Sequence, residues 1–292
     1  MQEAVSHHGE QLFTERTPRV VNAVKLKKTT ARRKAQRFLV EGENCVEAAV
    51  STGAATDVFA TRSATKRFSE IIQAAEAMGG FVHLIDEKAA KSLQDTVSST
   101  GIFAVCRDVL WSSREVLRGT PDLVVVPVET NDPGNAGTLV RVSDAMGADA
   151  VLFAGDTVDP QSGKAVRSSA GSLFHLPVAR ERNVNKVMSM VRQKGLTVFA
   201  TAMDGDVDLT EADELLTQPS CWLFGNEAHG LGDELLAQAD YRVRIPLRGR
   251  AESLNLAAAA SICLFESAKY QARVRRELRG DEANTPIQEN GV

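Results

Sequence analysis

The chain lacks any apolar run of the ~18–20 residues that a helix needs to span a membrane. Residues 1–8 also lack the apolar core of a secretory signal peptide. We therefore expect a cytoplasmic protein with no membrane partner. Hydrophobic residues make up 43% and charged residues 25% of the 292 positions, which is ordinary for a globular protein and supplies enough apolar material for two cores.

Cysteine is scarce, and no two cysteines have the C-x-x-C spacing typical of zinc sites and redox centres. Two of the five histidines are neighbours near the N-terminus, and the other three are isolated. We therefore expect no metal site. The four cysteines are interpreted as reduced, mostly buried, small apolar side chains. They are Cys45, Cys106, Cys221 and Cys263.

Two nucleotide-binding fingerprints are also absent. The sequence contains neither the G-x-G-x-x-G pattern of dinucleotide-binding domains nor the lysine motif of phosphate-binding loops. These absences disfavour an NAD-dependent oxidoreductase and a nucleoside triphosphatase. The oxidoreductase stays an alternative that a simple NAD-binding measurement would decide.

Strand-like and helix-like patterns alternate along the chain, which predicts an α/β fold. One helix is expected over residues 18–37, followed by short strands and helices up to 106, including a helix over 68–78. Residues 107–120 are polar and are expected to form a linker. We expect the following organisation: a disordered tail at 1–13, a first domain at 14–106, the linker at 107–120, a second domain at 121–279 and a disordered tail at 280–292.

The second domain opens on Leu123–Val128, a continuous β-branched run that is typical of a strand buried on both faces. Helices over 136–146 and 211–216 and a final helix from about Asn255 alternate with further strands. A glycine- and serine-rich loop is expected before residue 184. This alternation predicts a mostly parallel sheet covered by helices on both faces.

A basic segment lies in the first domain and contains no acidic residue. It could neutralise several phosphates of a nucleic acid, or it could be the solvated face of a helix. The net charge of −4 does not decide between these interpretations, because the distribution of charge matters more than its sum. The segment comprises Lys25, Lys27, Lys28, Arg32, Arg33, Lys34 and Arg37.

Three polar, glycine-bearing segments of the second domain each follow a predicted strand. Such segments meet at the carboxyl edge of a parallel sheet, where ligands bind. We therefore expect one site assembled from distant parts of the chain. The segments are Asn131–Gly137 with Arg141, Phe224–Leu231, and Ile245–Leu247 with Ser253–Leu256.

Each segment also has a purely structural interpretation. Asn135 is well placed to cap a helix, Glu227 could cap the helix expected near Asp233, and Ser253 could cap the final helix. Arg141 could be a surface residue or a clamp for a phosphate, because a guanidinium binds oxyanions with two parallel hydrogen bonds. Taken singly, the segments leave these alternatives open.

In this order and spacing, the segments resemble the motifs of the SpoU/TrmH branch of the SPOUT RNA methyltransferases. This family transfers a methyl group from S-adenosylmethionine to a ribose 2′-hydroxyl. The likeness rests on N-x-G-x-x-x-R from Asn135, G-N-E-x-x-G-L from Gly225, I-P-L with S-L-N ending at Asn255, and a family loop over 164–178. Residues ~14–106 resemble the ribosomal-protein-like α/β sandwich that often precedes the catalytic domain and binds the RNA substrate.

The resemblance implies a trefoil knot in the C-terminal domain and a homodimer formed through that domain, with each active site completed across the interface. It also implies S-adenosylmethionine as the cofactor, held in a bent shape by loops after three strands. The residues assigned to the cofactor are Thr201, Ala202, Phe224, Gly225, Asn226, Gly230, Ile245, Leu247, Ser253 and Leu254.

The resemblance further implies a catalytic set of Arg141, Asn135, Glu227, Ser253 and Asn255. Family proposals give Arg141 the role of base. Because arginine keeps its proton near neutral pH, we favour a clamp for the phosphate beside the target ribose, and both roles stay open. Asn135, Ser253 and Asn255 are expected to orient the ribose and Arg141. Glu227 is expected to fix the glycine loop or the substrate.

The expected partner is structured RNA, with ribosomal RNA favoured over transfer RNA. A transfer RNA methyltransferase and a noncatalytic RNA-binding or ribosome-assembly protein on the same fold are the alternatives. The residues expected to bind RNA are Lys25, Lys28, Arg32, Arg33, Arg37 and Arg167.

Overall fold

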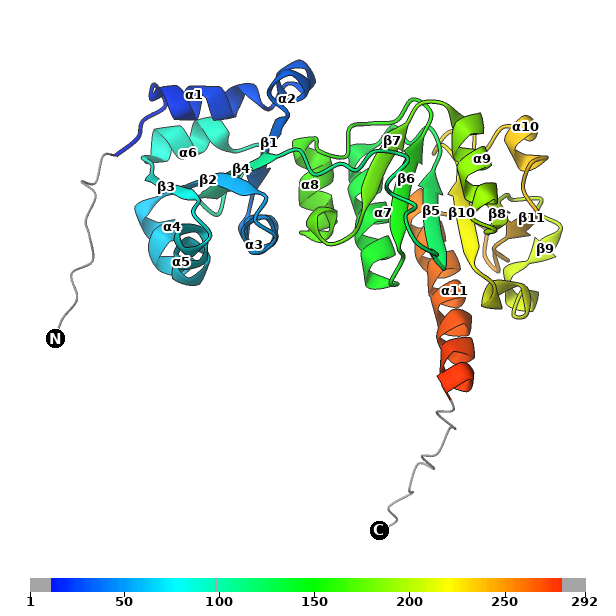
Figure 1. Ribbon diagram of the computed structural model, residues 1–292. Helices are drawn as coiled ribbons and strands as arrows, with labels where there is room; N and C mark the ends of the chain where they lie inside the picture. Colours follow the sequence, from blue (N-terminus) through cyan, green and yellow to red (C-terminus); the bar gives the residue numbers. More distant parts are fainter. Residues whose placement is uncertain (1–11, 98, 280–292) are drawn as a thin grey trace, which may run out of the picture.

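The computed structural model describes residues 12–97 and 99–279, which form two α/β domains side by side (Figure 1). No helix within these ranges is long and apolar enough to cross a membrane. The tails expected at 1–13 and 280–292 lie outside the described residues, apart from positions 12 and 13. Phe13 does not fit the expected tail, because its backbone pairs with Leu84 and Asp86 and its ring stacks on His83.

The N-terminal domain is a four-stranded sheet between two helical layers, in agreement with the expected sandwich. Its strand order is β1-β4-β2-β3, in which β4 runs antiparallel to β1 and β2 and β3 runs parallel to β2. Apolar side chains of α1 and α6 pack on one face, and those of α3 and α5 pack on the other. The elements are α1 (Pro18–Lys25), α2 (Thr29–Ala35), β1 (Arg37–Glu41), α3 (Glu43–Ser51), β2 (Ala55–Ala60), α4 (Arg62–Arg67), α5 (Ser69–Ala77), β3 (Phe81–Leu84), α6 (Glu87–Leu93) and β4 (Ile102–Arg107).

Of two helices predicted in this domain, one is broken in two and the other is continuous. The helix predicted over 18–37 divides into α1 and α2 because the Arg32 guanidinium binds the carbonyls of Leu26 and Lys27, which the turn leaves without helical partners. The helix predicted over 68–78 is confirmed as α5, which begins directly after the buried Phe68 and is preceded by the separate helix α4.

The C-terminal domain is built on a seven-stranded sheet in the order β7-β6-β5-β10-β8-β11-β9, and every pairing in it is parallel. Successive residues of its strands point to opposite faces. One face packs against α7 and α11 and the other against α9 and α10, while α8 packs on α7. The elements are β5 (Leu123–Pro127), α7 (Pro133–Ala145), β6 (Ala150–Ala154), α8 (Gly163–Ser169), β7 (Val178–Glu181), α9 (Val184–Gln193), β8 (Thr197–Thr201), β9 (Val207–Asp208), β10 (Ser220–Phe224), α10 (Asp233–Leu236), β11 (Tyr241–Arg244) and α11 (Leu256–Arg279).

Some elements of this domain differ from the prediction. The loop expected before residue 184 contains α8, a 3₁₀ turn at Ser172–Phe174 and the edge strand β7. The helix expected over 211–216 is two 3₁₀ turns, Leu209–Glu211 and Leu215–Thr217. The mostly parallel sheet itself is confirmed. The trefoil knot stays a prediction.

The segment expected to be a free linker is largely integrated into the fold. Arg107 ends β4, and the Trp111 amide donates to the carbonyl of Val178 beside β7. Val116 and Leu117 are buried in the core beneath α9. These apolar residues fix the segment to the C-terminal domain, because leaving them in water would cost the free energy of their burial.

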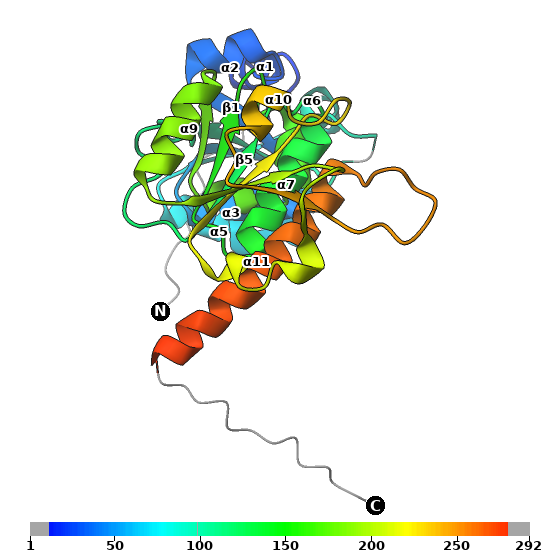
Figure 2. The same ribbon diagram turned by 90° about the vertical axis from the view of Figure 1, so that its right-hand side faces the viewer.

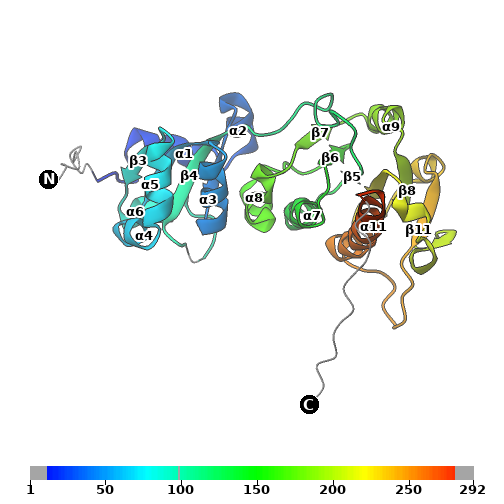
Figure 3. The same ribbon diagram turned by 60° about the horizontal axis from the view of Figure 1, so that its bottom comes forward.

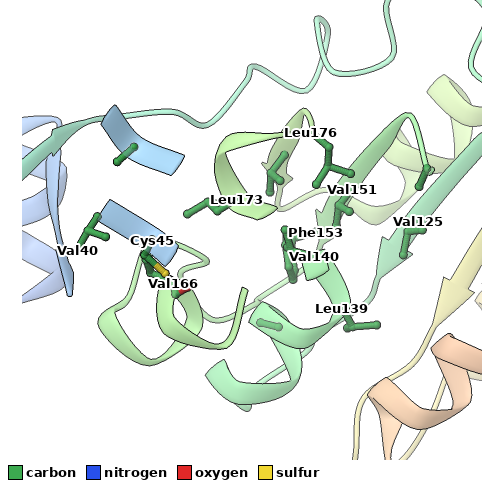
Figure 4. Close-up of a cluster of buried hydrophobic side chains, with 14 of the residues drawn as sticks. Val40, Cys45, Val125, Leu139, Val140, Val151, Phe153, Val166, Leu173 and Leu176 are labelled. Atoms are coloured by element: carbon green, nitrogen blue, oxygen red, sulfur yellow. Dashed lines mark hydrogen bonds between the residues drawn. The ribbon is translucent and has the colours of Figure 1, made fainter. Parts of the chain in front are cut away.

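The two domains share an apolar contact. Figure 3 shows α8 between α3 of the N-terminal domain and α7 of the C-terminal domain. Buried side chains of both domains meet there, including Val40 and Cys45 on one side and Val166 and Leu173 on the other (Figure 4). The Cys45 thiol donates to the Val166 carbonyl at 3.4 Å. Helix α8 therefore contacts both domains.

Candidate active site

The strand order brings the three motif segments to one edge of the large sheet. β10 lies between β5 and β8, and β11 is the next strand after β8. Because all these strands are parallel, the segments that follow them leave from the same carboxyl edge. The segments after β5, β10 and β11 are those that carry the predicted catalytic residues.

Hydrogen bonds join the three segments directly. The Asn135 side-chain Nδ2 donates to the Glu227 carboxylate at 3.0 Å. The Asn255 side-chain Nδ2 donates to the side-chain Oδ1 of Asn135, also at 3.0 Å. Glu227 also accepts from the backbone N–H groups of Asn131 and Asp132, both at 3.3 Å. These partners are 92 and 120 residues apart for the two side-chain contacts, so only the tertiary fold brings them together. We call Asn135, Glu227 and Asn255 the polar triplet.

The start of α7 differs from the prediction in its cap. Asp132, not Asn135, caps the helix: its carboxylate accepts from the Asn135 N–H at 2.9 Å, and Pro133 occupies the first turn. The Asn135 side chain is thereby free to contact Glu227. Lys164 of α8 binds the second carboxylate oxygen of Asp132 at 2.8 Å, and this hydrogen bond is the main reason that the pKa of Asp132 lies below its ordinary value.

Glycine is required where α7 meets α8 and where the second motif turns back on itself. A Cβ at Gly137 would lie 2.1 Å from the Ala165 carbonyl oxygen, so the two helix backbones touch. A Cβ at Gly225 would lie 2.3 Å from the Gly230 carbonyl carbon. Asn226 and Gly230 exchange backbone hydrogen bonds of 3.0 and 2.9 Å, which close a tight turn. Glu227 stands at this turn and not at the cap of α10, which follows Gly232.

The segment before α11 also departs from expectation. The side-chain Oδ1 of Asn255 accepts from the Ala257 N–H at 2.9 Å and from the Ala258 N–H at 3.4 Å, so Asn255 caps the helix and Ser253 does not. Leu247, Ser253 and Leu254 are exposed in the loop between β11 and α11. Figure 2 shows this loop projecting away from the domain.

The remaining residues assigned to the cofactor lie at the ends of β8, β10 and β11. The Thr201 hydroxyl donates to the Leu223 carbonyl at 3.2 Å, and the Ala202 N–H donates to the Val243 carbonyl at 3.0 Å. Phe224 is fully buried beside Trp222, whereas Ile245 is half-buried. The Asn226 amide donates to the Glu129 carbonyl at 2.6 Å, which ties the second motif to the end of β5.

Partial desolvation raises the pKa of the Glu227 carboxyl, but its hydrogen bonds outweigh this effect. The Asn135 amide and the backbone N–H groups of Asn131 and Asp132 all donate to the charged form, and the net pKa lies below the ordinary value. Glu227 is therefore an anion at neutral pH. An anion held by donors of the Asn131–Gly137 segment is suited to positioning Asn135 and not to supplying a proton.

Arg141 stands apart from the polar triplet. Its side chain on α7 is exposed and makes no hydrogen bond or ion pair with any other residue that the structure describes. It lies six residues beyond Asn135, which is about 240° around a helix. Within one chain, the structure thus brings together Asn135, Glu227 and Asn255, and it does not add Arg141 or Ser253 to them.

Two of the residues expected to bind RNA are committed to the domain junction instead. The Arg32 side chain is buried and binds one carboxylate oxygen of Asp159 through two nitrogens, at 3.0 and 2.7 Å. Arg167 is half-buried and pairs with Asp95 and Glu41 of the N-terminal domain, at 3.3 and 3.6 Å. The Arg32 guanidinium is fully committed to its contacts, whereas the contacts of Arg167 involve only its Nη1. Lys25, Lys28, Arg33 and Arg37 are exposed, as the prediction requires.

Metal-ligating residues do not gather in the part of the chain that the structure describes, where no group of three or more is placed to hold an ion. All four cysteines are buried free thiols, as predicted, and burial raises the pKa of Cys45 to about 11. Two surface cavities of about 460 and 550 Å³ lie beside α9 and between β9, α10 and β11. Neither of these two cavities is lined by a residue of the polar triplet.

Comparison with known proteins decides the family. Residues 122–265 match the SpoU rRNA methylase family, and residues 17–104 match the MRM3-like substrate-binding domain. The 23S rRNA (guanosine(2553)-2′-O)-methyltransferase RlmP of Bacillus subtilis is 31% identical over 259 residues, which cover 88% of this chain and 98% of that protein. The chain belongs to the SpoU rRNA methylase family. A 23S rRNA (uridine(2479)-2′-O)-methyltransferase of Streptomyces viridochromogenes is 40% identical over 68% of the chain and 75% of the relative.

Solved structures of SpoU-family proteins share both domains. An AdoMet-bound rRNA methyltransferase from Sinorhizobium meliloti superposes with a TM-score of 0.78 at 30% identity, covering 89% of this chain and 98% of that one. The SpoU methyltransferase AviRb of Streptomyces viridochromogenes, in complex with AdoMet, superposes with a TM-score of 0.77 at 28% identity, covering 89% of this chain and 100% of that one.

In the sequence of this SpoU-family chain, Asp132, Asn131 and Lys164 were not identified as residues that support the site. Asp132 could have been predicted as a helix cap, because aspartate is favoured at the N-cap and proline at the first helical position that follows it.

Proposed function

We propose that this protein transfers the methyl group of S-adenosylmethionine to a ribose 2′-hydroxyl of ribosomal RNA. The polar triplet carries the proposal, because it joins the three family motifs at the sheet edge where ligands bind in parallel α/β folds. The named relatives act on 23S rRNA, and two of the matching structures hold AdoMet. An rRNA substrate fits the cytoplasmic location that the sequence predicts.

The segments after β8, β10 and β11 suit a cofactor with both apolar and polar groups. Leu247 and Leu254 expose apolar surface there, and the backbone turn at Gly225 allows close approach. We assign the same ten residues to the cofactor as the sequence does. When bound, the cofactor supplies an electrophilic sulfonium methyl group. The protein must then hold the ribose oxygen in line with that methyl group, and alignment alone can contribute several kcal/mol.

The chain's own residues perform the positioning. Glu227 orients the Asn135 amide, and Asn255 holds the other end of that amide while it caps α11. Arg141 is assigned the phosphate beside the target ribose and the negative charge that grows on the ribose oxygen. Ser253 is assigned a contact to the ribose. We assign RNA binding to Lys25, Lys28, Arg33, Arg37 and Arg167, and Arg32 is withdrawn because it is buried in its ion pair with Asp159.

We also propose a homodimer formed through the C-terminal domain. Ile262 and Phe265 of α11 are 40% and 53% exposed, and such apolar side chains on one helix fit an interface. Arg141 lies on the neighbouring helix α7 without a partner among the described residues, so it is free to complete the site of a second subunit. Sedimentation equilibrium with a Phe265→Glu variant tests this, and a wild-type monomer would contradict it.

The test of function combines two assays on purified protein. Calorimetry with S-adenosylmethionine should show binding, and a radiolabelled methyl group should appear on unmodified large-subunit rRNA and not on transfer RNA. Binding of the cofactor without any methyl transfer would favour the noncatalytic RNA-binding alternative. Absence of cofactor binding would overturn the proposal.

A further inference from the structure

Helix α2 of the N-terminal domain lies against the carboxyl edge of the large sheet. The ion pair between Arg32 and Asp159 fixes this arrangement, because Asp159 belongs to the segment that follows β6. Figures 1 and 2 show α2 on the same side of the molecule as α10, which follows the carboxyl end of β10. The N-terminal domain thus approaches the edge that carries the polar triplet.

Three arginines from both domains lie close enough together for their charges to interact, and one of them contacts the segment 156–159. Arg180 of β7 donates from its guanidinium to the carbonyl and hydroxyl of Thr157. Arg33 is the neighbour of Arg32 on α2, and Arg182 directly follows β7. The side chains of Arg33 and Arg182 are exposed, and neither is paired with any residue that the structure describes. We call Arg33, Arg180 and Arg182 the junction arginines.

The junction arginines repel one another where they lie. Burial lowers the pKa of Arg180; Asp159 opposes this, and the charges of Arg33 and Arg182 lower the pKa further. Asp159 is already neutralised by Arg32, which leaves the exposed Asp156 as the other nearby acid. The surface therefore carries an excess of positive charge, which an anion with several oxygens would stabilise.

The position of the junction arginines, between the substrate-binding domain and the polar triplet, indicates which anion they bind. From β7 to β10 the sheet has three steps, or about 14 Å at about 4.8 Å per step. An RNA strand that leaves the N-terminal domain for the polar triplet must cross β7 and β6 at their carboxyl ends. We propose that the exposed junction arginines, Arg33 and Arg182, bind successive phosphates of this strand and guide it from the substrate-binding domain to the site. The inference rests on the proposed function.

The test replaces the two exposed members, Arg33→Gln with Arg182→Gln. Arg273→Gln with Arg276→Gln is the matched control, because it removes the same charge from the exposed part of α11 that projects below the sheet (Figure 1). The probe is unmodified large-subunit rRNA transcribed in vitro. We expect the Kd for this RNA to rise about tenfold at moderate salt, and the slope of log K against log salt to fall by about 2. Cofactor affinity and kcat at saturating RNA should stay at wild-type values.

An RNA affinity and salt slope equal to those of the control would overturn the inference. A second variant, Arg33→Lys with Arg182→Lys, retains the charge and should restore most of the affinity; affinity as poor as in the glutamine variant would also count against it, because it would indicate a structural role. Failure of the proposed function gives a different result, since the wild-type protein would then transfer no methyl group to any RNA.

Discussion

The domain junction and the candidate site use charged and polar side chains in opposite ways. At the junction, Arg32 is 5% exposed and its guanidinium is fully occupied by Asp159 and two carbonyls. At the site, Glu227 and Asn255 are exposed, and each is held by backbone N–H groups and by the Asn135 side chain. We therefore expect substitutions at the junction to change the free energy of unfolding, and substitutions at the site to change the rate of methyl transfer.

The largest expected effect comes from breaking the buried pair at the junction. Arg32→Met leaves the Asp159 carboxylate buried without its partner, which typically costs 3–5 kcal/mol, so we expect about that loss in the free energy of unfolding. Urea unfolding of the full chain measures it. The control is Arg33→Met, an exposed neighbour whose replacement should change stability by less than about 0.5 kcal/mol. Equal stability of the two variants, with weaker RNA binding by Arg32→Met, would restore Arg32 to the RNA-binding set.

The second-largest effect is expected from replacing Arg141, which should lower kcat without changing stability or cofactor affinity. Arg141→Ala removes the guanidinium assigned to the phosphate and the developing oxyanion, and the loss of one such group lowers kcat by about 10²–10³. Stability and cofactor affinity should stay near wild type, because Arg141 is exposed and unpaired among the described residues. A methyl-transfer assay and calorimetry measure the two quantities, with Arg276→Ala as the control. Full activity of Arg141→Ala would end its catalytic assignment.

A smaller loss of turnover is expected from Glu227→Gln. The variant keeps the shape of the side chain but loses the charge that accepts from Asn135 and two backbone N–H groups. Hydrogen bonds to charged groups contribute about 1.5–3 kcal/mol, so kcat should fall by about tenfold to a hundredfold. Glu234→Gln on α10 is the matched control. Should both variants transfer methyl groups at the wild-type rate, Glu227 would have only a structural part in its turn.

The smallest effect concerns the pH dependence of Asp132. Its pKa is lowered in the folded state, chiefly by the hydrogen bond from Lys164, so its contribution to stability is present above about pH 4 and is lost as the pH falls through the folded pKa. In Lys164→Met that pKa should rise toward the ordinary value of about 3.9. Carboxyl NMR titration of both proteins measures the shift. Identical titration curves would show that Lys164 does not act on Asp132.

The fold could be predicted wherever the local pattern is strong. The run at Leu123–Val126 is apolar at every position, and it forms the buried strand β5 as expected. The edge strand β7 was missed because only Val178 and Ala179 are apolar before the charged Arg180 and Glu181. The strand β9 has only two residues, too few for any periodic pattern.

The sequence predicts which residues form the candidate site, but it does not predict which of them contact one another. Sequence motifs identified Asn135, Glu227 and Asn255, which the structure joins. They could not distinguish Arg32 from Arg33, because both lie in the same basic helix and Asp159 is 127 residues away from Arg32. Packing of α2 against the second domain buries Arg32 and leaves Arg33 exposed. No local sequence pattern predicts that contact.

The most direct test of the account is a crystal structure of this protein with S-adenosylhomocysteine bound. We predict that the ligand contacts the three segments after β8, β10 and β11, within one pocket beside Asn135 and Glu227. A ligand bound elsewhere, for example in the cavity between Asn185 and Gln238, would contradict the claim that these distant segments form one methyl-transfer site.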